Sequence, residues 1–368
     1  MCAIGVVAGG RHGRDARRRT RLNGALFSFH VSLFGASLCA GCFAPAQDAA
    51  PRPTVDVRVV ARVDHPIASV AFSSDDQRLI VTTASGEIDL CDPNGKVAAG
   101  RLRAPVGTSG DGEVIGALLL SDTSTIVSLV VGGTLRRPQA RVLRFSMDGR
   151  DAHEVRAGLL GDSRVSAAGR SVVVASRGVP ERNMCEIAGI TSRGEAWSWH
   201  FTCHDPNDRF GFPCGVAANA AGTRAALAWS DGIVTFCDAA GGAADVDVGE
   251  PGIAMTFAPN AEDVAIAGSR RVAIWNATTG RVLRTFGSPQ GGCGVAAFDD
   301  GGTRLAVGNR GGRLRIVDAT AGTILYDEIV ADRAVTGLAF AKGGDRLAVA
   351  AIDRVYLLSD LPGTRLKP

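Results

Sequence analysis

The chain has 368 residues, of which 46% are hydrophobic and 21% are charged, so it is large and apolar enough to form a buried core. The formal net charge of +3 is unevenly distributed: residues 1–46 hold six arginines and one aspartate, or +5, so residues 47–368 carry −2. A body without net positive charge lacks the electrostatic footprint of a nucleic-acid-binding domain, which argues against nucleic acid as the partner.

The first 46 residues have the three zones of an export signal. Six arginines fall within residues 11–21, a mainly apolar stretch follows at 25–41, and Ala44-Pro45-Ala46 provides a small-residue cleavage site. We therefore expect an exported protein, periplasmic or extracellular, whose mature chain begins at Gln47. We expect no membrane span in that mature chain.

A second interpretation of the same segment is a lipoprotein signal, in which Cys42 would carry a lipid anchor to the cell envelope. Two small residues stand directly before Cys42, as in a lipobox. Leu38, however, lies one position earlier than the leucine of that motif, and Cys39 holds its place. Both interpretations predict export, and residues 47–53 follow as a flexible linker.

A repeated pattern begins after the linker. Each repeat has a small-residue strand ending near phenylalanine, a polar turn, an apolar strand, a second turn, a third strand ending in aspartate or asparagine, and a fourth strand. Phe257, Phe298 and Phe340 are spaced by 41 and 42 residues, a period typical of four-stranded propeller blades. The clearest repeats are 67–102, 253–286, 294–329 and 335–360.

The number of repeats follows from the gap between the first and second of these segments. Three degenerate units fill it, at 114–156, 162–202 and 215–248, which gives seven. The last unit stops after three strands, and residues 54–63 have the alternating valines of a missing fourth strand. We therefore predict an all-β fold, a seven-bladed β-propeller of four-stranded antiparallel blades. It would span 54–363, be closed by strand 54–63 joining the last blade, and be followed by a tail at 364–368.

The repeats resemble those of the WD-repeat family. The segment 64–92 is the most similar, with His65 at the place of that family's loop histidine, and 229–238 has Asp231 at the turn aspartate. Trp275-Asn276 replaces the signature Trp-Asp pair. The segment 276–286 also resembles the repeats of quinoprotein-like propellers. Both resemblances imply a propeller fold. Only the aspartate of the signature pair is kept in Cys91-Asp92, Cys237-Asp238 and Val317-Asp318.

The sequence offers little sign of catalysis. Residues 47–368 contain no Gly-x-Ser-x-Gly elbow, phosphate-binding loop or His-Glu-x-x-His motif, so we predict no catalytic residue and no cofactor. Asp75, Asp92, Asp231 and Asp238 are interpreted as turn residues whose side chains bond local backbone amides.

One unusual stretch, 197–214, combines tryptophans, histidines and cysteines. Trp197 and Trp199 would share one face of a strand, with His200 on the other. His200, Cys203 and His204 have the chemistry of zinc or copper ligands, but we favour a packed loop without metal.

Export permits disulfides, and the loop of this stretch is the place where we predict one. We favour Cys203–Cys214, which would pin the base of the loop. Cys185–Cys203 is the alternative, if strands 183–191 and 195–203 pair so that these residues lie opposite each other. We expect the other cysteines of the mature chain to be small buried side chains. These are Cys91, Cys237 and Cys293.

Arginines recur in the second turn of several repeats, and these turns share one end of a propeller. Such a basic rim would steer an acidic partner. We therefore expect a binding or scaffold protein that holds a protein partner through loops at one end, without catalysis of its own. The alternative is a propeller enzyme, such as a lactonase or a quinone-dependent dehydrogenase. The rim candidates are Arg136, Arg137, Arg177, Arg182, Arg270, Arg271, Arg310 and Arg313.

Overall fold

The computed structural model divides the chain into two units, residues 1–51 and 52–368, and all the residues it describes lie in the second. Between residues 100 and 202 it describes the strands mainly through their backbone. The described residues are 55–73, 75–94, 100–103, 113–119, 125–134, 137–146, 152–160, 164–168, 171–177, 184–191, 194–202, 213–252, 254–260 and 262–363.

These residues form β-strands that assemble into four-stranded antiparallel sheets. No helix long and apolar enough to cross a membrane occurs in the described part of the chain. The sheets up to residue 202 are β2 (Ile67–Phe72), β3 (Leu79–Thr83), β4 (Glu87–Cys91) and β5 (Gly100–Arg103); β6 (Glu113–Leu119), β7 (Thr125–Thr134), β8 (Arg137–Ser146) and β9 (Ala152–Leu160); and β10 (Arg164–Ala168), β11 (Ser171–Arg177), β12 (Met184–Thr191) and β13 (Gly194–Thr202).

The next sheets follow the same order. They are β14 (Pro213–Ala218), β15 (Arg224–Trp229), β16 (Ile233–Asp238) and β17 (Ala243–Asp247); β18 (Ala254–Phe257), β19 (Asp263–Ala267), β20 (Arg271–Asn276) and β21 (Arg281–Gly287); and β22 (Val295–Phe298), β23 (Arg304–Gly308), β24 (Arg313–Asp318) and β25 (Ile324–Ile329). The remaining sheet contains β26 (Val335–Phe340), β27 (Leu347–Ala351), β28 (Arg354–Ser359) and β1 (Asp56–Arg62). We name each sheet after its first hairpin strand, from the β2 sheet to the β26 sheet.

The strand nearest the start of the described chain completes the sheet nearest its end. β1 pairs antiparallel with β28, from Asp56 opposite Ser359 to Arg62 opposite Arg354. The pairing predicted for residues 54–63 with the last repeat is therefore present. Without β1, the backbone groups at the outer edge of β28 would be left unpaired.

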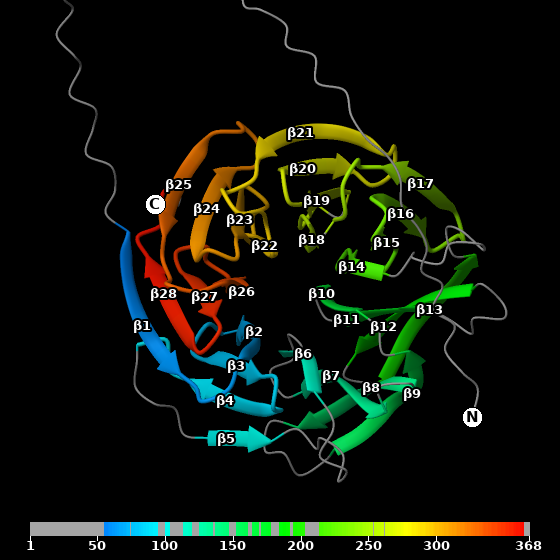
Figure 1. Cartoon of the computed structure of the whole chain (residues 1–368), viewed down its shortest axis with the longest axis horizontal. Helices are drawn as coiled ribbons and strands as arrows, with labels where there is room; N and C mark the ends of the chain where they lie inside the picture. The colour runs from blue at the N-terminus through cyan, green and yellow to red at the C-terminus, as the bar shows by residue number, and fades with distance from the viewer. Residues whose placement is uncertain are drawn as a thin grey trace, which may run out of the picture. The chain divides into compact units, whose positions relative to one another are not determined.

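Neighbouring sheets meet through their first strands. β2 contacts β6, and the series continues through β10, β14, β18, β22 and β26, which in turn contacts β2 (Figure 1). Small residues allow this close approach: a Cβ added to Gly337 of β26 would lie 3.2 Å from a methyl carbon of Val70 in β2. This arrangement of antiparallel sheets is compatible with the predicted propeller-like repeat fold.

The hydrophobic core lies between successive sheets. All five residues are buried in each of the second strands β3, β23 and β27, whereas most residues of the outer strands β1 and β21 are exposed. Leu314 of the β22 sheet, for example, belongs to one buried cluster with Leu347 and Val349 of the β26 sheet. Each such leucine or valine stabilises the fold by about 1.5–3 kcal/mol relative to its exposed state, so the junctions hold the sheets together.

Aspartates and asparagines form the turns, as predicted. The carboxylate of Asp238 accepts hydrogen bonds from the amides of Ala240 and Gly242, at 2.9 Å each. Asp75, Asp92 and Asp231 accept equivalent bonds from backbone amides two residues ahead, at 3.1, 2.7 and 3.0 Å. The hydrogen bond from Ser73 and that from the Gln77 amide lower the pKa of Asp75. These carboxylates are therefore explained by turn formation.

Antiparallel hairpins give each sheet two ends. We call end 1 the one that carries the turns after the first and third strands of each sheet, and end 2 the one that carries the turn after the second strand and the connection to the next sheet.

Candidate functional site

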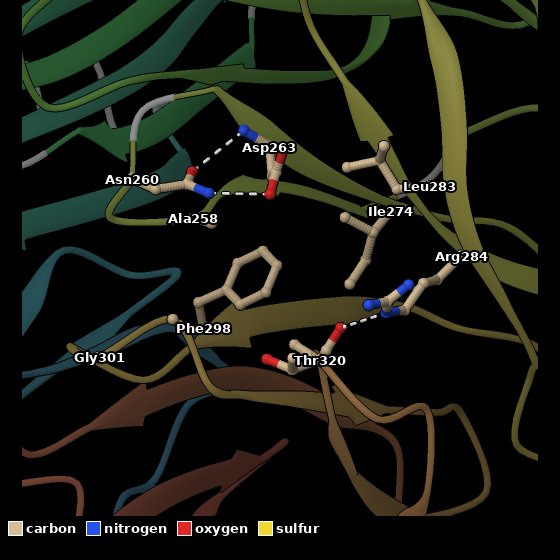
Figure 2. A pocket seen from close by; sticks show the side chains of 11 residues that line it. Ala258, Asn260, Asp263, Ile274, Leu283, Arg284, Phe298, Gly301 and Thr320 are labelled. Carbon is tan, nitrogen blue, oxygen red and sulfur yellow. Dashed lines mark hydrogen bonds between the residues drawn. The ribbon is translucent and has the colours of Figure 1, made fainter.

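A cavity of about 300 Å³ lies at end 1 between the β18 and β22 sheets (Figure 2). Its volume is at the lower end of the range for ligand sites, roughly 300–1,000 Å³. We call it the junction cavity. It is lined by Ala258, Asn260, Asp263, Ile274, Leu283, Arg284, Phe298, Gly301, Gly302, Ala319 and Thr320.

One wall is the turn between β18 and β19, which fixes the carboxylate of Asp263. The side-chain oxygen of Asn260 accepts hydrogen bonds from the amides of Glu262 and Asp263, at 3.1 Å each. The Asn260 amide nitrogen donates to Oδ2 of Asp263 at 2.8 Å. Asp263 is half-buried, begins β19 and lines the cavity. The turn thus holds a carboxylate at the cavity wall.

The opposite wall is the outer strand β21. A β-bulge between Ile274 and Trp275 leaves Leu283 as the extra residue, and its side chain is 45% exposed. The next residue, Arg284, donates from Nε to the carbonyl oxygen of Ala319 at 3.1 Å, which ties β21 to the β24–β25 turn. A guanidinium has five N–H donors, and this bond uses one of them.

An aromatic ring completes the site. Phe298, the last residue of β22, is half-buried, and Figure 2 shows its ring directed into the cavity between the Asn260–Asp263 pair and the Thr320 turn. Gly301, which is exposed, and Gly302, which is half-buried, extend this wall. The cavity therefore combines a carboxylate, a guanidinium, an aromatic face and aliphatic side chains, which is the composition of a binding site that recognises both charge and apolar surface.

The described members of the arginine rim predicted from the sequence lie at end 2, away from this cavity. Arg270 and Arg271 are in the β19–β20 turn, and both face the buried carboxylate of Glu250, with N–O distances of 3.6 and 4.0 Å. Glu250 also accepts hydrogen bonds from Ser269 Oγ and from the amides of the two arginines, at 2.7, 2.9 and 3.0 Å. Burial opposes ionisation of Glu250, but these bonds hold its pKa below the usual range.

The next sheet repeats this arrangement of one carboxylate between two arginines. Arg313 donates to Oδ1 of Asp327 at 2.6 Å, and Arg315 donates to Oδ2 at 2.7 Å. Burial opposes the ionisation of Asp327, but the two arginines lower its pKa overall. Arg310 is exposed at the tip of the same turn. The arginines of these two turns therefore include three that are paired with carboxylates of the same chain.

The other rim residues lie where side chains are not described. Arg137 begins β8 and Arg177 ends β11, and their side chains lie outside the described part. Arg136, Arg182 and the possible lipidation residue Cys42 lie outside the described residues altogether.

Trp197 and Trp199 share one face of β13, as predicted, whereas the loop at 203–212 lies outside the described residues. The Trp197 and Trp199 rings stack with centroids 4.6 Å apart. His200 is exposed on the other face, where Nε2 lies 3.4 Å from a carboxylate oxygen of Glu186. Among the described residues no group of three potential metal ligands occurs, and Cys203 and His204 lie outside them.

The register of β12 and β13 bears on the predicted disulfides. Cys185 lies opposite Phe201, two residues before Cys203, so the expectation that Cys185 and Cys203 face each other is wrong. The β12–β13 turn is centred one residue earlier than that expectation required. The favoured pair Cys203–Cys214 stays a prediction because Cys203 is not described. The Cys214 thiol is directed at the carbonyl oxygens of Gly252 and Ala228, at 3.2 and 3.5 Å.

The three cysteines expected to be small buried side chains are buried. Cys91, Cys237 and Cys293 are 8%, 6% and 2% exposed. Burial raises the pKa of Cys237 to about 12 and that of Cys293 to about 11, so both thiols are protonated and unreactive at neutral pH.

The sequence matches no protein-family model and no curated protein. The site must therefore be interpreted from its own geometry.

Sequence reasoning missed the residues of the junction cavity, although the repeats contain a signal for it. The second strand begins with or directly follows arginine in the three other clear repeats, at Arg78, Arg304 and Arg346, and in the degenerate unit 215–248, at Arg224. In the repeat at 253–286 the same position is Asp263. This reversal of charge at an equivalent position marks the cavity.

Proposed function

We propose that the protein is an exported, closed, seven-bladed β-propeller that binds a protein partner and carries out no catalysis of its own. The series of four-stranded sheets, the contacts that lead from β2 through successive first strands back to β2, and the pairing of β1 with β28 support this fold. The leader-like composition of residues 1–46 supports export.

The observation that carries the binding function is a set of exposed apolar side chains on β21, which lines the junction cavity, and on β25, which follows the Ala319–Thr320 turn of its lining. Val282 and Leu283 of β21 are 46% and 45% exposed, and Ile324 at the start of β25 is 56% exposed. The Arg284–Ala319 hydrogen bond joins the segments that carry them. A partner that seats one side chain in the cavity and covers these residues would remove apolar surface from water around a central anchor, as in protein–protein interfaces.

We propose the partner site at end 1 rather than at end 2, where the sequence had suggested it. Four arginines in the β18 and β22 sheets at end 2 already face carboxylates of the same chain: Glu250 lies between Arg270 and Arg271, and Asp327 is bonded to Arg313 and Arg315. The junction cavity, in contrast, presents charged groups to the surface. Its lining contains no histidine, cysteine, serine or lysine, which favours binding over acid–base or nucleophilic chemistry at this site.

The test is site-specific crosslinking in the cell that produces the protein. A photoreactive amino acid is placed at Leu283, and the matched control is Ile329, which is 67% exposed at the other end of β25. We expect one discrete protein adduct in the envelope fraction from position 283 and its absence from position 329. Ile324→Glu, introduced into the chain that carries the photoreactive residue at position 283, should reduce capture of the same protein. No adduct at 283, or the same adducts at both positions, would overturn the proposal.

A further inference from the structure

Two other junctions, between the β22 and β26 sheets and between the β26 and β2 sheets, are filled by an arginine side chain at the position of the junction cavity. Between the β22 and β26 sheets, the guanidinium of Arg304 lies over the ring of Phe340, 5.4 Å from its centroid. Between the β26 and β2 sheets, the guanidinium of Arg346 lies over the ring of Phe72 at 5.5 Å. Each arginine stands at the start of a second strand, and each ring ends the first strand of the next sheet. A cation over an aromatic face is a stabilising arrangement.

The same arginines also donate to a backbone carbonyl in the following turn. Arg304 donates from one terminal nitrogen to the carbonyl oxygen of Gly344, and Arg346 donates to that of Asp76 at 3.4 Å. Gly344 and Asp76 hold the same position in their turns, four residues after the phenylalanine, and both have a left-handed backbone, with φ of 69° and 56°. Each closed junction is therefore a guanidinium receptor made of a ring and a carbonyl.

The junction cavity retains this receptor but lacks its arginine. Phe298 holds the place of the ring, and Gly302, four residues later with φ of 65°, holds the place of the carbonyl. The position of the arginine is taken by Asp263, because Asp263 pairs with Asn276 as Arg304 pairs with Asp318. No side chain of the described residues therefore occupies the position of the guanidinium, and a carboxylate stands at the wall instead of an arginine.

We propose that the junction cavity binds the guanidinium of an arginine side chain presented by a partner protein. The Phe298 ring would stack on the guanidinium, the Gly302 carbonyl would accept one N–H, and the Asp263 carboxylate would accept two more in a charge-assisted pair. Arginine fits better than lysine because its planar fork matches a carboxylate and a ring at once. This inference rests on the proposed function and names the chemistry of the partner.

The positive charge of Arg284 on the opposite wall limits where the guanidinium can lie. Its bond to the Ala319 carbonyl holds it on the β21 side of the cavity, while Asp263 and Phe298 approach from the β18–β19 turn and β22 (Figure 2). The remaining N–H groups of Arg284 are suited to a main-chain carbonyl of the partner. The incoming arginine would therefore bind with its guanidinium at Asp263 and its backbone beside Arg284.

The experiment is a calorimetric titration of the full chain with four capped tripeptides whose central residue is arginine, lysine, citrulline or leucine between glycines. We expect the arginine peptide to bind most tightly and the citrulline peptide, which is neutral but of similar shape, to bind about tenfold more weakly. Equal binding of the arginine and citrulline peptides would overturn the proposal, as would strongest binding of the leucine or lysine peptide.

Two variants locate the site. Asp263→Asn should weaken binding of the arginine peptide by about tenfold. The matched control is Asp300→Asn, which changes the net charge equally at an exposed position in the β22–β23 turn, outside the cavity lining, and should change affinity by less than about twofold. Equal loss in both variants would show that the peptide senses only net charge, which overturns the proposal.

The outcomes separate this proposal from the proposed function. A partner crosslinked at position 283 together with no preference for arginine would leave the binding function standing and refute the guanidinium site. Specific binding of the arginine peptide without any crosslinked protein would establish the site and refute the protein partner.

Discussion

The two junctions that flank the β22 sheet differ in the residue at the start of the second strand, which is arginine at one and aspartate at the other. Between the β22 and β26 sheets, Arg304 is 4% exposed and joins Asp299, Gly344 and Pro362 through hydrogen bonds, so the junction is filled. Between the β18 and β22 sheets, the equivalent Asp263 is half-buried and a cavity of about 300 Å³ remains. Because strand order, ring position and turn conformation are the same, the difference comes from the side chain at this position and from the residues after β28, which reach only the closed junction.

The outer strands of these junctions show the same contrast. A β-bulge leaves Leu325 unpaired in β25 as it leaves Leu283 unpaired in β21. Leu325 is half-buried and packs on the cluster that contains Leu361, whereas Leu283 is 45% exposed. The residues after β28 thus cover one leucine and leave its counterpart at the open junction accessible. The repeated sheets form equivalent junctions, and the residues at each junction determine whether it is filled or leaves a cavity.

The largest effect that tests this comparison is expected from Arg304→Ala. The change leaves the buried carboxylate of Asp299 without its ion pair at 3.0 Å and leaves the Gly344 carbonyl without its side-chain donor. Breaking a buried ion pair by removing one partner costs about 3–5 kcal/mol of unfolding free energy. Denaturant unfolding measures the loss.

The matched control for this variant is Arg270→Ala, because the Arg270 side chain is 77% exposed although it also faces a carboxylate. Its loss should stay below about 1 kcal/mol. Similar losses in the two variants would show that Arg304 does not hold its junction closed.

A smaller effect is expected from truncating the two bulge leucines. Leu325→Ala removes packing against the Leu361 cluster and should lower the unfolding free energy by about 2 kcal/mol, at the low end for leucine because Leu325 is only half-buried. Leu283→Ala removes an exposed side chain and should change it by less than about 0.5 kcal/mol. Thermal melting of the pair gives the difference directly. Equal decreases in melting temperature would mean that Leu283 is as well packed as Leu325. They would contradict the conclusion that the β18–β22 junction is more open than the β22–β26 junction.

The repeat pattern predicted most of what governs strand pairing. Regular phenylalanine spacing and polar turns indicated the four-stranded units, and the alternating valines before residue 63 indicated that this strand joins the last repeat, as β1 does with β28. These features depend on local turn chemistry and side-chain alternation, which are legible in one sequence. The register of β12 and β13 stayed open in the sequence, and the structure places Cys185 opposite Phe201, which removes the alternative pairing with Cys203.

The candidate site was harder to predict because it depends on the absence of an arginine side chain at one junction between sheets. Asp263 looks like an ordinary turn carboxylate until the arginines at the same position elsewhere are seen lying over Phe340 and Phe72. The arginine-rich turns, in contrast, looked like a basic surface because their partners Glu250 and Asp327 come from other segments of the chain. Charge compensation across segments is a tertiary property and leaves little trace in sequence order.

The smallest expected effect is also the most direct test, because Asp263→Arg would convert the open junction into a closed one. The new guanidinium would meet the Phe298 ring and the Gly302 carbonyl as Arg304 meets Phe340 and Gly344. The gain is limited because Arg284 stands where the closed junction has Tyr326, so the two cations repel each other. We expect the unfolding free energy to rise by about 0.5–1 kcal/mol in denaturant titrations and binding of the arginine peptide to be lost.

Asp300→Arg makes the same change in net charge on an exposed turn outside the cavity, and it should leave stability within about 0.5 kcal/mol and peptide binding intact. A stabilised Asp263→Arg protein that still bound the peptide would show that the arginine lies elsewhere, whereas equal stabilisation by both changes would trace the gain to the overall charge of the body rather than to the filled junction.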